Sequence, residues 1–134
     1  MPVRIIIFDD NEKLRHSLVT VLSTSDNYEV VGNYSNVLDV KNIISETFPD
    51  VVILDIEMPG KDGISAVPVI KETYPEASII MYTQYEDEEK LFSSISAGAD
   101  GYILKKTPPQ LLFEAIEEVS TGGAPLSPSI AKRM

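Results

Sequence analysis

The chain has 134 residues, enough for one domain that buries its own core without disulfides or structural metal ions. Its 21 acidic and 11 basic side chains give a formal net charge of −10. Such a surface repels a polyanion, so the chain alone should not bind DNA. It contains no cysteine, which excludes disulfides and thiolate metal sites and fits a reducing compartment.

The start of the chain and its apolar runs indicate the cellular compartment of the protein. No apolar run approaches the ~20 residues that a membrane helix needs. Residues 1–4 lead directly into the apolar residues 5–8, and this stretch lacks the length and the cleavage site of a signal peptide. We therefore expect a cytoplasmic protein with no membrane partner.

Five short apolar runs recur along the chain, at residues 3–8, 28–34, 51–54, 78–82 and 101–104. All but the second are nearly continuous in aliphatic residues, as strands are when both faces of a parallel sheet are covered. The segments between them carry apolar residues at helical spacing. Strand and helix alternate five times, which predicts an α/β fold with a doubly wound five-stranded parallel sheet in a three-layer sandwich.

The ends of the expected helices have their own markers. Ser35 or Asn36 should cap the second helix. Thr107 should cap the fifth, with Pro108 as its first residue. Gly98 suits the C-terminus of the helix before it.

The third helix contains a proline that limits where it begins. Pro68 has no N–H to donate, and the first-turn N–H groups of a helix have no partner within the helix. A start near Ser65 would put the proline in that first turn. We therefore expect a short third helix that is irregular at its start.

Polar side chains follow four of the five expected strands. Asp9 and Asp10 come after the first strand and Asp55 after the third. Thr83 follows the fourth strand and Lys105 the fifth. Ligands of an open parallel sheet bind outside the carboxyl ends of its strands, at the point where the strand order reverses. Three acids, a hydroxyl and an ammonium group should therefore converge on one edge.

This set of side chains suits the transfer of a phosphoryl group. Three neighbouring carboxylates repel one another, so one must take up a proton or a cation must lie among them. Oxygen ligands without His or Cys favour a hard ion such as Mg²⁺. The ion would neutralise an incoming phosphoryl group and leave one Asp free as the nucleophile. Lys105 would add positive charge, and Thr83 a hydroxyl.

Four motifs, in this order and with these gaps, resemble the receiver domain of two-component response regulators. They are Ile7-Phe8-Asp9-Asp10-Asn11, the run from Leu54 to Gly63, Tyr82-Thr83, and the run from Ala97 to Lys106. The resemblance covers roughly residues 3–121. It implies a flavodoxin-like three-layer sandwich with strand order 2-1-3-4-5. It also implies that a sensor histidine kinase or a small phosphodonor supplies the phosphoryl group.

The resemblance assigns roles to the acids. It makes Asp55 the phosphoacceptor. It makes Asp10, Asp55 and the backbone carbonyl of Glu57 the direct ligands of Mg²⁺ or Mn²⁺, with Asp9 acting through water. Such a domain is not an enzyme in the usual sense, because it catalyses only its own phosphorylation and dephosphorylation.

The resemblance also implies how the site controls the surface. Lys105 would contact the phosphoryl group, and Thr83 and Tyr102 would be the switch pair that changes conformation on phosphorylation. In the unphosphorylated protein we expect the Tyr102 side chain to point outward or to sample both orientations. Taken alone, Tyr102 is also compatible with a half-buried strand residue.

The composition changes after Thr121. We expect a receiver domain at residues 1–121 and, at residues 122–134, a linker outside the core followed by the start of a truncated C-terminal segment. The linker resembles the one that precedes the LuxR-type helix-turn-helix output domain of NarL/FixJ-like regulators. The expected partners are then a sensor histidine kinase, a second copy in a homodimer, and DNA only through an output domain outside this chain.

Three other functions compete with this interpretation. An aspartyl-phosphate hydrolase would use a carboxylate two residues after the nucleophile, where Glu57 stands, but the haloacid dehalogenase group has Asp-x-Asp after its first strand instead of adjacent acids. A dinucleotide-binding module would need Gly-x-Gly-x-x-Gly there, which is absent. A receiver-like interaction module that is never phosphorylated would not need all five site residues.

Overall fold

The computed structural model describes residues 1–134 and contains one parallel sheet of five strands. The strands are β1 (Val3–Phe8), β2 (Tyr28–Tyr34), β3 (Val51–Leu54), β4 (Ser78–Thr83) and β5 (Gly101–Leu104). They lie in the order β2-β1-β3-β4-β5. The predicted fold class, strand order and apolar runs are confirmed, with β4 one residue longer than its run.

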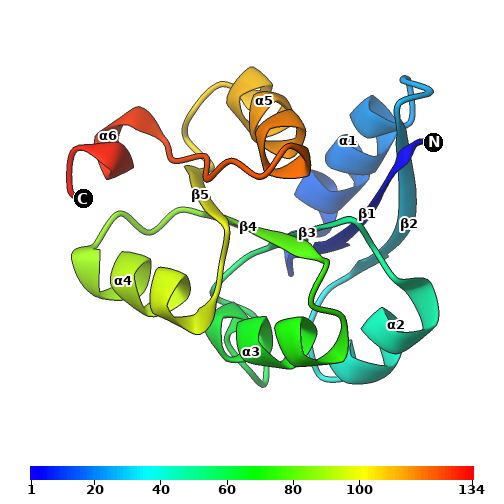
Figure 1. The fold of residues 1–134 in the computed structure, drawn as a ribbon, viewed down its shortest axis with the longest axis horizontal. Coiled ribbons are helices and arrows are strands. Elements are labelled where there is room, and N and C mark those ends of the chain that lie inside the picture. The colour runs from blue at the N-terminus through cyan, green and yellow to red at the C-terminus, as the bar shows by residue number, and fades with distance from the viewer.

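Helices cover both faces of the sheet (Figure 1). One face is covered by α1 (Glu12–Leu22) and α5 (Pro109–Ser120), and the other by α2 (Val40–Thr47), α3 (Gly63–Thr73) and α4 (Glu88–Ala97). Successive side chains of a strand point to opposite faces. Thus Ile6 and Phe8 of β1 join the core on the α2–α4 side, and Ile5 and Ile7 join the core on the α1–α5 side. No helix is long and apolar enough to cross a membrane.

Two helices begin elsewhere than predicted. The third helix starts at Gly63, two residues before Ser65, because Asp62 caps it by accepting a hydrogen bond from the Ser65 amide at 2.9 Å. Pro68 therefore lies beyond the first turn and removes one helical hydrogen bond. The second helix starts at Val40, because the Asn36 side chain caps the turn before it by accepting from the Leu38 amide.

The other two predicted helix ends differ in outcome. In α5 the proline at the first helical position is Pro109 and not Pro108, because the Thr107 hydroxyl donates to the Leu104 carbonyl and closes a turn before the helix. Gly98 ends α4 in the left-handed conformation, with φ 118°. The prediction of a glycine C-cap is confirmed.

The last part of the chain packs onto the sheet. Residues 124–131, which we call the C-terminal strap, run beside β5 and end in the short helix α6 (Pro128–Ala131). The Tyr102 amide donates to the Pro125 carbonyl at 2.9 Å, and the Ser127 amide donates to the Tyr102 carbonyl at 3.1 Å. Ile130 is fully buried in the same core cluster as Tyr102. The expectation that this segment lies outside the core is therefore wrong, because the edge strand β5 offers free backbone groups that the strap pairs with.

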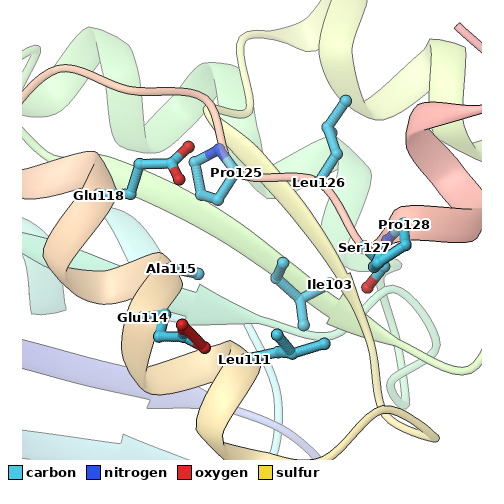
Figure 2. A pocket seen from close by; sticks show the side chains of 9 residues that line it. All are labelled: Ile103, Leu111, Glu114, Ala115, Glu118, Pro125, Leu126, Ser127 and Pro128. Carbon is cyan, nitrogen blue, oxygen red and sulfur yellow. The ribbon is translucent and has the colours of Figure 1, made fainter.

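Figure 2 shows the groove between the C-terminal strap and α5. Ile103 of β5 forms its floor, with Leu111 of α5 on one side and Leu126 of the strap on the other. This groove contains none of the predicted site residues.

Candidate functional site

Three carboxylates meet at the carboxyl end of the sheet. Asp9 and Asp10 follow β1, and Asp55 follows β3, the neighbour of β1. One oxygen of each lies within 4.8 Å of the others. Asp9 is 2% and Asp55 6% exposed, whereas Asp10 is exposed. The strand order therefore gathers the acids as predicted.

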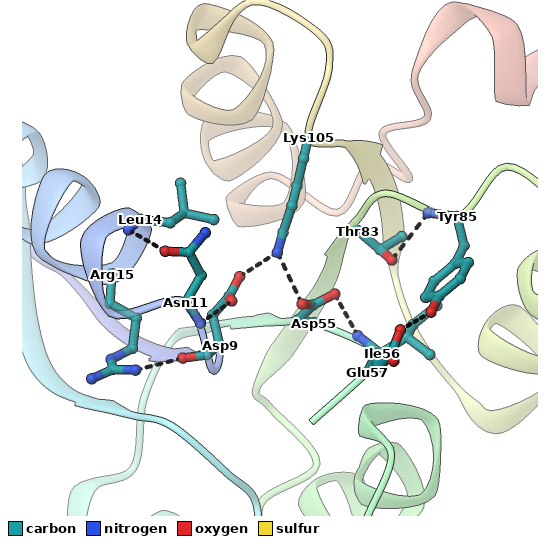
Figure 3. A network of polar contacts seen from close by, with 10 residues as sticks. All are labelled: Asp9, Asn11, Leu14, Arg15, Asp55, Ile56, Glu57, Thr83, Tyr85 and Lys105. Atoms are coloured by element: carbon teal, nitrogen blue, oxygen red, sulfur yellow. Dashed lines mark hydrogen bonds and ion pairs between the residues drawn. The ribbon is translucent and has the colours of Figure 1, made fainter. Parts of the chain in front are cut away.

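Lys105 lies between the two buried acids (Figure 3). Its Nζ is 2.7 Å from an oxygen of Asp9 and 2.9 Å from Oδ2 of Asp55. Lys105 directly follows β5, and its amide donates to the Thr83 carbonyl at the end of β4. The backbone of the two strands thus sets the position from which the ammonium group reaches across the site.

The charges in the site oppose one another. Burial raises the pKa of Asp55 above its usual value, and the charge of Asp9 adds to that rise. The hydrogen bond and charge of Lys105 act in the opposite direction without cancelling the effect. Burial alone would lower the pKa of Lys105, but its bonds to the two acids raise it overall. One ammonium group therefore only partly compensates three carboxylates, and a further cation would favour their charged forms.

The Asp55 carboxylate is held at both oxygens. The Ile56 amide donates to Oδ1 at 2.7 Å, and Lys105 donates to Oδ2 at 2.9 Å. The loop after Asp55 folds back closely, since the Gly63 amide donates to the Ile56 carbonyl at 2.6 Å. A Cβ atom at position 63 would lie 1.8 Å from the main-chain oxygen of Asp55. Only glycine fits this approach.

The loops after β3 and β4 touch across the edge of the site. The Tyr85 hydroxyl donates to the Glu57 carboxylate, and the Tyr85 amide donates to the Thr83 hydroxyl oxygen at 3.3 Å. The Lys90 ammonium lies 4.8 Å from the centre of the Tyr85 ring. Glu57 stands two residues after Asp55, and Tyr85 stands two residues after Thr83, but the sequence does not indicate that the two side chains are paired.

The two residues predicted as a switch pair are both buried. Thr83 and Tyr102 are each 0% exposed. The Tyr102 hydroxyl donates to the Tyr85 carbonyl at 2.8 Å. The expectation of an outward or mixed Tyr102 side chain is not met: the carbonyl and the C-terminal strap beside β5 favour the buried orientation.

These groups surround an open polar pocket of about 290 Å³. Its lining is entirely hydrophilic: Asp10, Asn11, Asp55, Glu57, Gln84 and Lys105. Two of them, Asn11 and Gln84, were not singled out from the sequence, although each directly follows a predicted site residue. The pocket has the size and polarity for a hydrated ion together with a phosphoryl group.

This fold and this edge of acids define a receiver domain. Residues 5–117 match the model of the response regulator receiver domain, and the chain belongs to that family. The family consists of signal-transducing domains and not of metabolic enzymes.

The relatives of known name are regulatory proteins. The chain is 37% identical over 128 residues to the uncharacterized transcriptional regulatory protein YhcZ of Bacillus subtilis, covering 96% of this chain and 59% of that protein. It is 36% identical over 121 residues to the oxygen regulatory protein NreC of Staphylococcus epidermidis, covering 90% of this chain and 56% of NreC. The chain thus spans less than two thirds of the length of these relatives.

Solved structures give the same fold. A LuxR-family two-component response regulator from Aurantimonas sp. superposes with a TM-score of 0.92 at 30% identity, over 98% of this chain and 94% of that one. The isolated REC domain of RcsB from Salmonella enterica, determined with the phosphomimetic BeF3−, has a TM-score of 0.88 at 25% identity, over 98% of each chain.

Proposed function

We propose that this chain takes a phosphoryl group on Asp55 from a sensor histidine kinase, in the presence of Mg²⁺ or Mn²⁺, and changes conformation to control transcription. The observation that carries this proposal is the arrangement of Lys105 and three carboxylates around one open polar pocket. The name of YhcZ, a transcriptional regulatory protein, supports the output.

The donor set fits a hard divalent ion. The three carboxylates offer oxygens within 4.8 Å of one another, and no His or Cys side chain lines the pocket. Asp10, Asp55 and the backbone carbonyl of Glu57 would be direct ligands, with Asp9 acting through water. When bound, the ion supplies positive charge that offsets the repulsion between the acids and the phosphoryl group.

The chain's own residues perform the transfer. One carboxylate oxygen of Asp55 forms the bond to phosphorus as the bond from phosphorus to the donor breaks, and the donor leaves with that electron pair. Lys105 moves its hydrogen bond from Asp55 to a phosphoryl oxygen. The Thr83 hydroxyl donates to another phosphoryl oxygen, giving up the contact with the Tyr85 amide. Thr83 and Tyr102 then act as the switch pair, and phosphorylation holds Tyr102 in the buried orientation that it already has in this structure.

The competing functions are less well supported. In a hydrolase, Glu57 would have to act on water or on a leaving group, but the Tyr85 hydroxyl binds its carboxylate. A module that is never phosphorylated has no need for an ammonium group shared between two buried acids. We further propose a homodimer as a partner state. We also propose that DNA is contacted only through residues outside this chain, because the net charge of −10 repels a polyanion.

Asp55→Asn should abolish phosphorylation while leaving the fold intact. The amide keeps the shape of the side chain but cannot form the acyl phosphate. Incubation with acetyl phosphate and Mg²⁺, followed by intact mass, should show one added phosphoryl group on the parent and none on the variant. Asp26→Asn, an exposed acid in the turn before β2, is the matched control and should behave like the parent. Labelling of the Asp55→Asn protein would point to another acceptor.

Asp10→Ala should remove the response of the melting temperature to Mg²⁺. At 100 times its dissociation constant, an ion that binds only the folded state stabilises it by about 2.7 kcal/mol, or roughly 9 °C at this size. The variant should also be more stable than the parent in metal-free buffer, because one of three repelling charges is gone. Asp26→Ala should keep the full response. A response unchanged in Asp10→Ala would place the ion elsewhere.

A further inference from the structure

Asp9 and Asp10 are adjacent, yet both carboxylates reach the same site. Successive side chains of an extended strand point to opposite faces, so strand geometry alone would separate the two acids. Their carboxylates come together because the chain leaves β1 at this point and turns toward α1. The peptide group between Asp9 and Asp10 therefore decides where the exposed Asp10 carboxylate lies.

A side chain from α1 holds that peptide group. Nη1 of Arg15 donates to the main-chain oxygen of Asp9 at 2.7 Å, and its Nε donates to Oδ1 of Asn33 at 3.1 Å. Asn33 lies in β2, opposite Ile7 in the register of the sheet. Figure 3 shows Arg15 reaching Asp9 on the side away from Lys105. The guanidinium thus ties the β1–α1 turn to β2 without touching the pocket.

The other polar groups of Asp9 already have partners, so the hydrogen bond from Arg15 to its carbonyl decides the direction of the Asp9–Asp10 peptide group. Its amide donates to the Tyr34 carbonyl at 3.0 Å, and its carboxylate accepts from the Asn11 amide at 2.9 Å as well as from Lys105. These bonds fix the Asp9 amide and side chain. The carbonyl, whose direction sets the peptide plane that leads into Asp10, depends on Arg15. The donor is charged, and such hydrogen bonds are roughly twice as strong as neutral ones.

We propose that Arg15 is a positioning residue of the divalent-cation site, acting through the Asp9–Asp10 peptide and braced by Asn33. This inference rests on the proposed function, because it concerns the same site. Arg15 does not line the pocket, so it would touch neither the ion nor the phosphoryl group. Its role is to keep the Asp10 carboxylate turned toward Asp55, so that the protein need not order this turn when the ion binds.

The test is a Mn²⁺ titration followed by electron paramagnetic resonance, without any phosphodonor. Arg15→Met should weaken Mn²⁺ binding about tenfold, the lower end of the loss seen when a group that orients a metal ligand is removed. The Mn²⁺ affinity of Arg15→Lys should lie between those of Arg15→Met and the parent. An ammonium group cannot bond the Asp9 main-chain oxygen and Oδ1 of Asn33 together in the geometry of the guanidinium fork. Lys13→Met, an exposed site on the same helix, should bind like the parent.

Asn33 supplies a second, milder perturbation. Asn33→Ala leaves the bond to the Asp9 carbonyl but frees the guanidinium, so Mn²⁺ binding should weaken less than in Arg15→Met. The double variant should be no weaker than Arg15→Met alone, because both changes act through one bond. If the losses of the two single variants instead add in full, the brace does not exist.

A phosphorylation assay distinguishes a positioning role of Arg15 from a general loss of structure at the site. With acetyl phosphate, the Mg²⁺ concentration for half-maximal rate should rise about tenfold in Arg15→Met, while the rate at saturating Mg²⁺ stays within about twofold of the parent. Unchanged affinity, or a loss of maximal rate alone, would overturn the inference. If the parent itself binds no Mn²⁺ and takes no phosphoryl group, the proposed function fails and this inference with it. If the parent binds Mn²⁺ and takes a phosphoryl group, and Arg15→Met binds Mn²⁺ with the same affinity, only the role of Arg15 is refuted.

Discussion

Gly63→Ala should lower the melting temperature by roughly 10 °C. The added Cβ would lie 1.8 Å from the main-chain oxygen of Asp55, far inside van der Waals contact, and neither partner is a flexible side chain. The loop after β3 or the start of α3 must therefore shift. Overpacking of this kind costs about 3 kcal/mol at the upper end of its usual range, which corresponds to that change at this chain length. Thermal unfolding followed by circular dichroism measures it.

The sign of this effect is informative, because helix propensity predicts the opposite. Alanine in place of glycine at an unstrained helical position stabilises a protein by about 0.4–1 kcal/mol. Gly122→Ala is the matched control: Gly122 has φ +89° and no neighbour within 4 Å of an added Cβ. It should cost only the backbone term of about 1 kcal/mol. A Gly63→Ala protein as stable as the parent would contradict the close approach.

Gly63→Ala should also slow phosphorylation, because the atom that the new methyl group displaces belongs to the acceptor residue. The Asp55 carboxylate accepts a hydrogen bond from the Ile56 amide, and the carbonyl of Ile56 accepts one from the Gly63 amide. One glycine therefore joins the start of α3 to the geometry of the acceptor, and the acetyl phosphate assay reports the displacement separately from stability.

The sequence predicted the sheet well because the information is local. Four of the five strands are short aliphatic runs, and in a parallel sheet with both faces covered such a run has few alternatives. The position of Asp9, Asp55 and Lys105 follows from the same property, since each directly follows a strand end and all strand ends lie on one edge. The strand order of the sheet thus brings together Asp9 and Lys105, which are 96 positions apart in the sequence.

Contacts that depend on side-chain direction were not predictable in this way. Arg15 stands on a helix whose polar residues usually face solvent, and only the folded structure turns it toward the Asp9 carbonyl. The pairing of Tyr85 with Glu57 joins two loops, whose course the sequence does not define. The same holds for the helix ends. Near Ser65 and Pro108, neighbouring polar residues and prolines compete for the cap, and the observed starts differ from the predicted ones by one or two residues.

The C-terminal strap shows a different reason for failure. Its prolines and the two glycines that precede it are typical of a linker, and the chain does turn at Thr121 and Gly122 after α5. Its apolar anchor, Ile130, is a single residue without periodicity. Pairing with β5 is non-local, and a free sheet edge is visible only once the strand order is known.

Ile130→Ala should loosen the C-terminal strap and, through it, Tyr102. Removing a buried isoleucine side chain costs about 2–5 kcal/mol in a closed core. Here α6 has only four residues and one buried side chain and can separate locally, so the global loss should be about 2 kcal/mol. Amide exchange at Tyr102 and Ser127, whose N–H groups join the strap to β5, should accelerate by tenfold or more, since tenfold corresponds to only about 1.4 kcal/mol. Ser129→Ala, an exposed neighbour on α6, should leave both rates unchanged.

The same variant tests how phosphorylation would act on Tyr102. A ligand shifts an equilibrium only when the two states differ in affinity, and a population that is already near one extreme has little left to move. In the parent, Tyr102 is fully buried and bonded to the Tyr85 carbonyl, so adding Mg²⁺ and beryllofluoride should change its ring resonances little. In Ile130→Ala, where the outward orientation gains population, the same addition should move the ring signals toward those of the parent. NMR of a protein labelled at the tyrosine rings makes the comparison. Ring signals of Ile130→Ala that match the parent before any addition would show that the strap does not hold Tyr102, and that the Tyr85 carbonyl is sufficient to keep it buried.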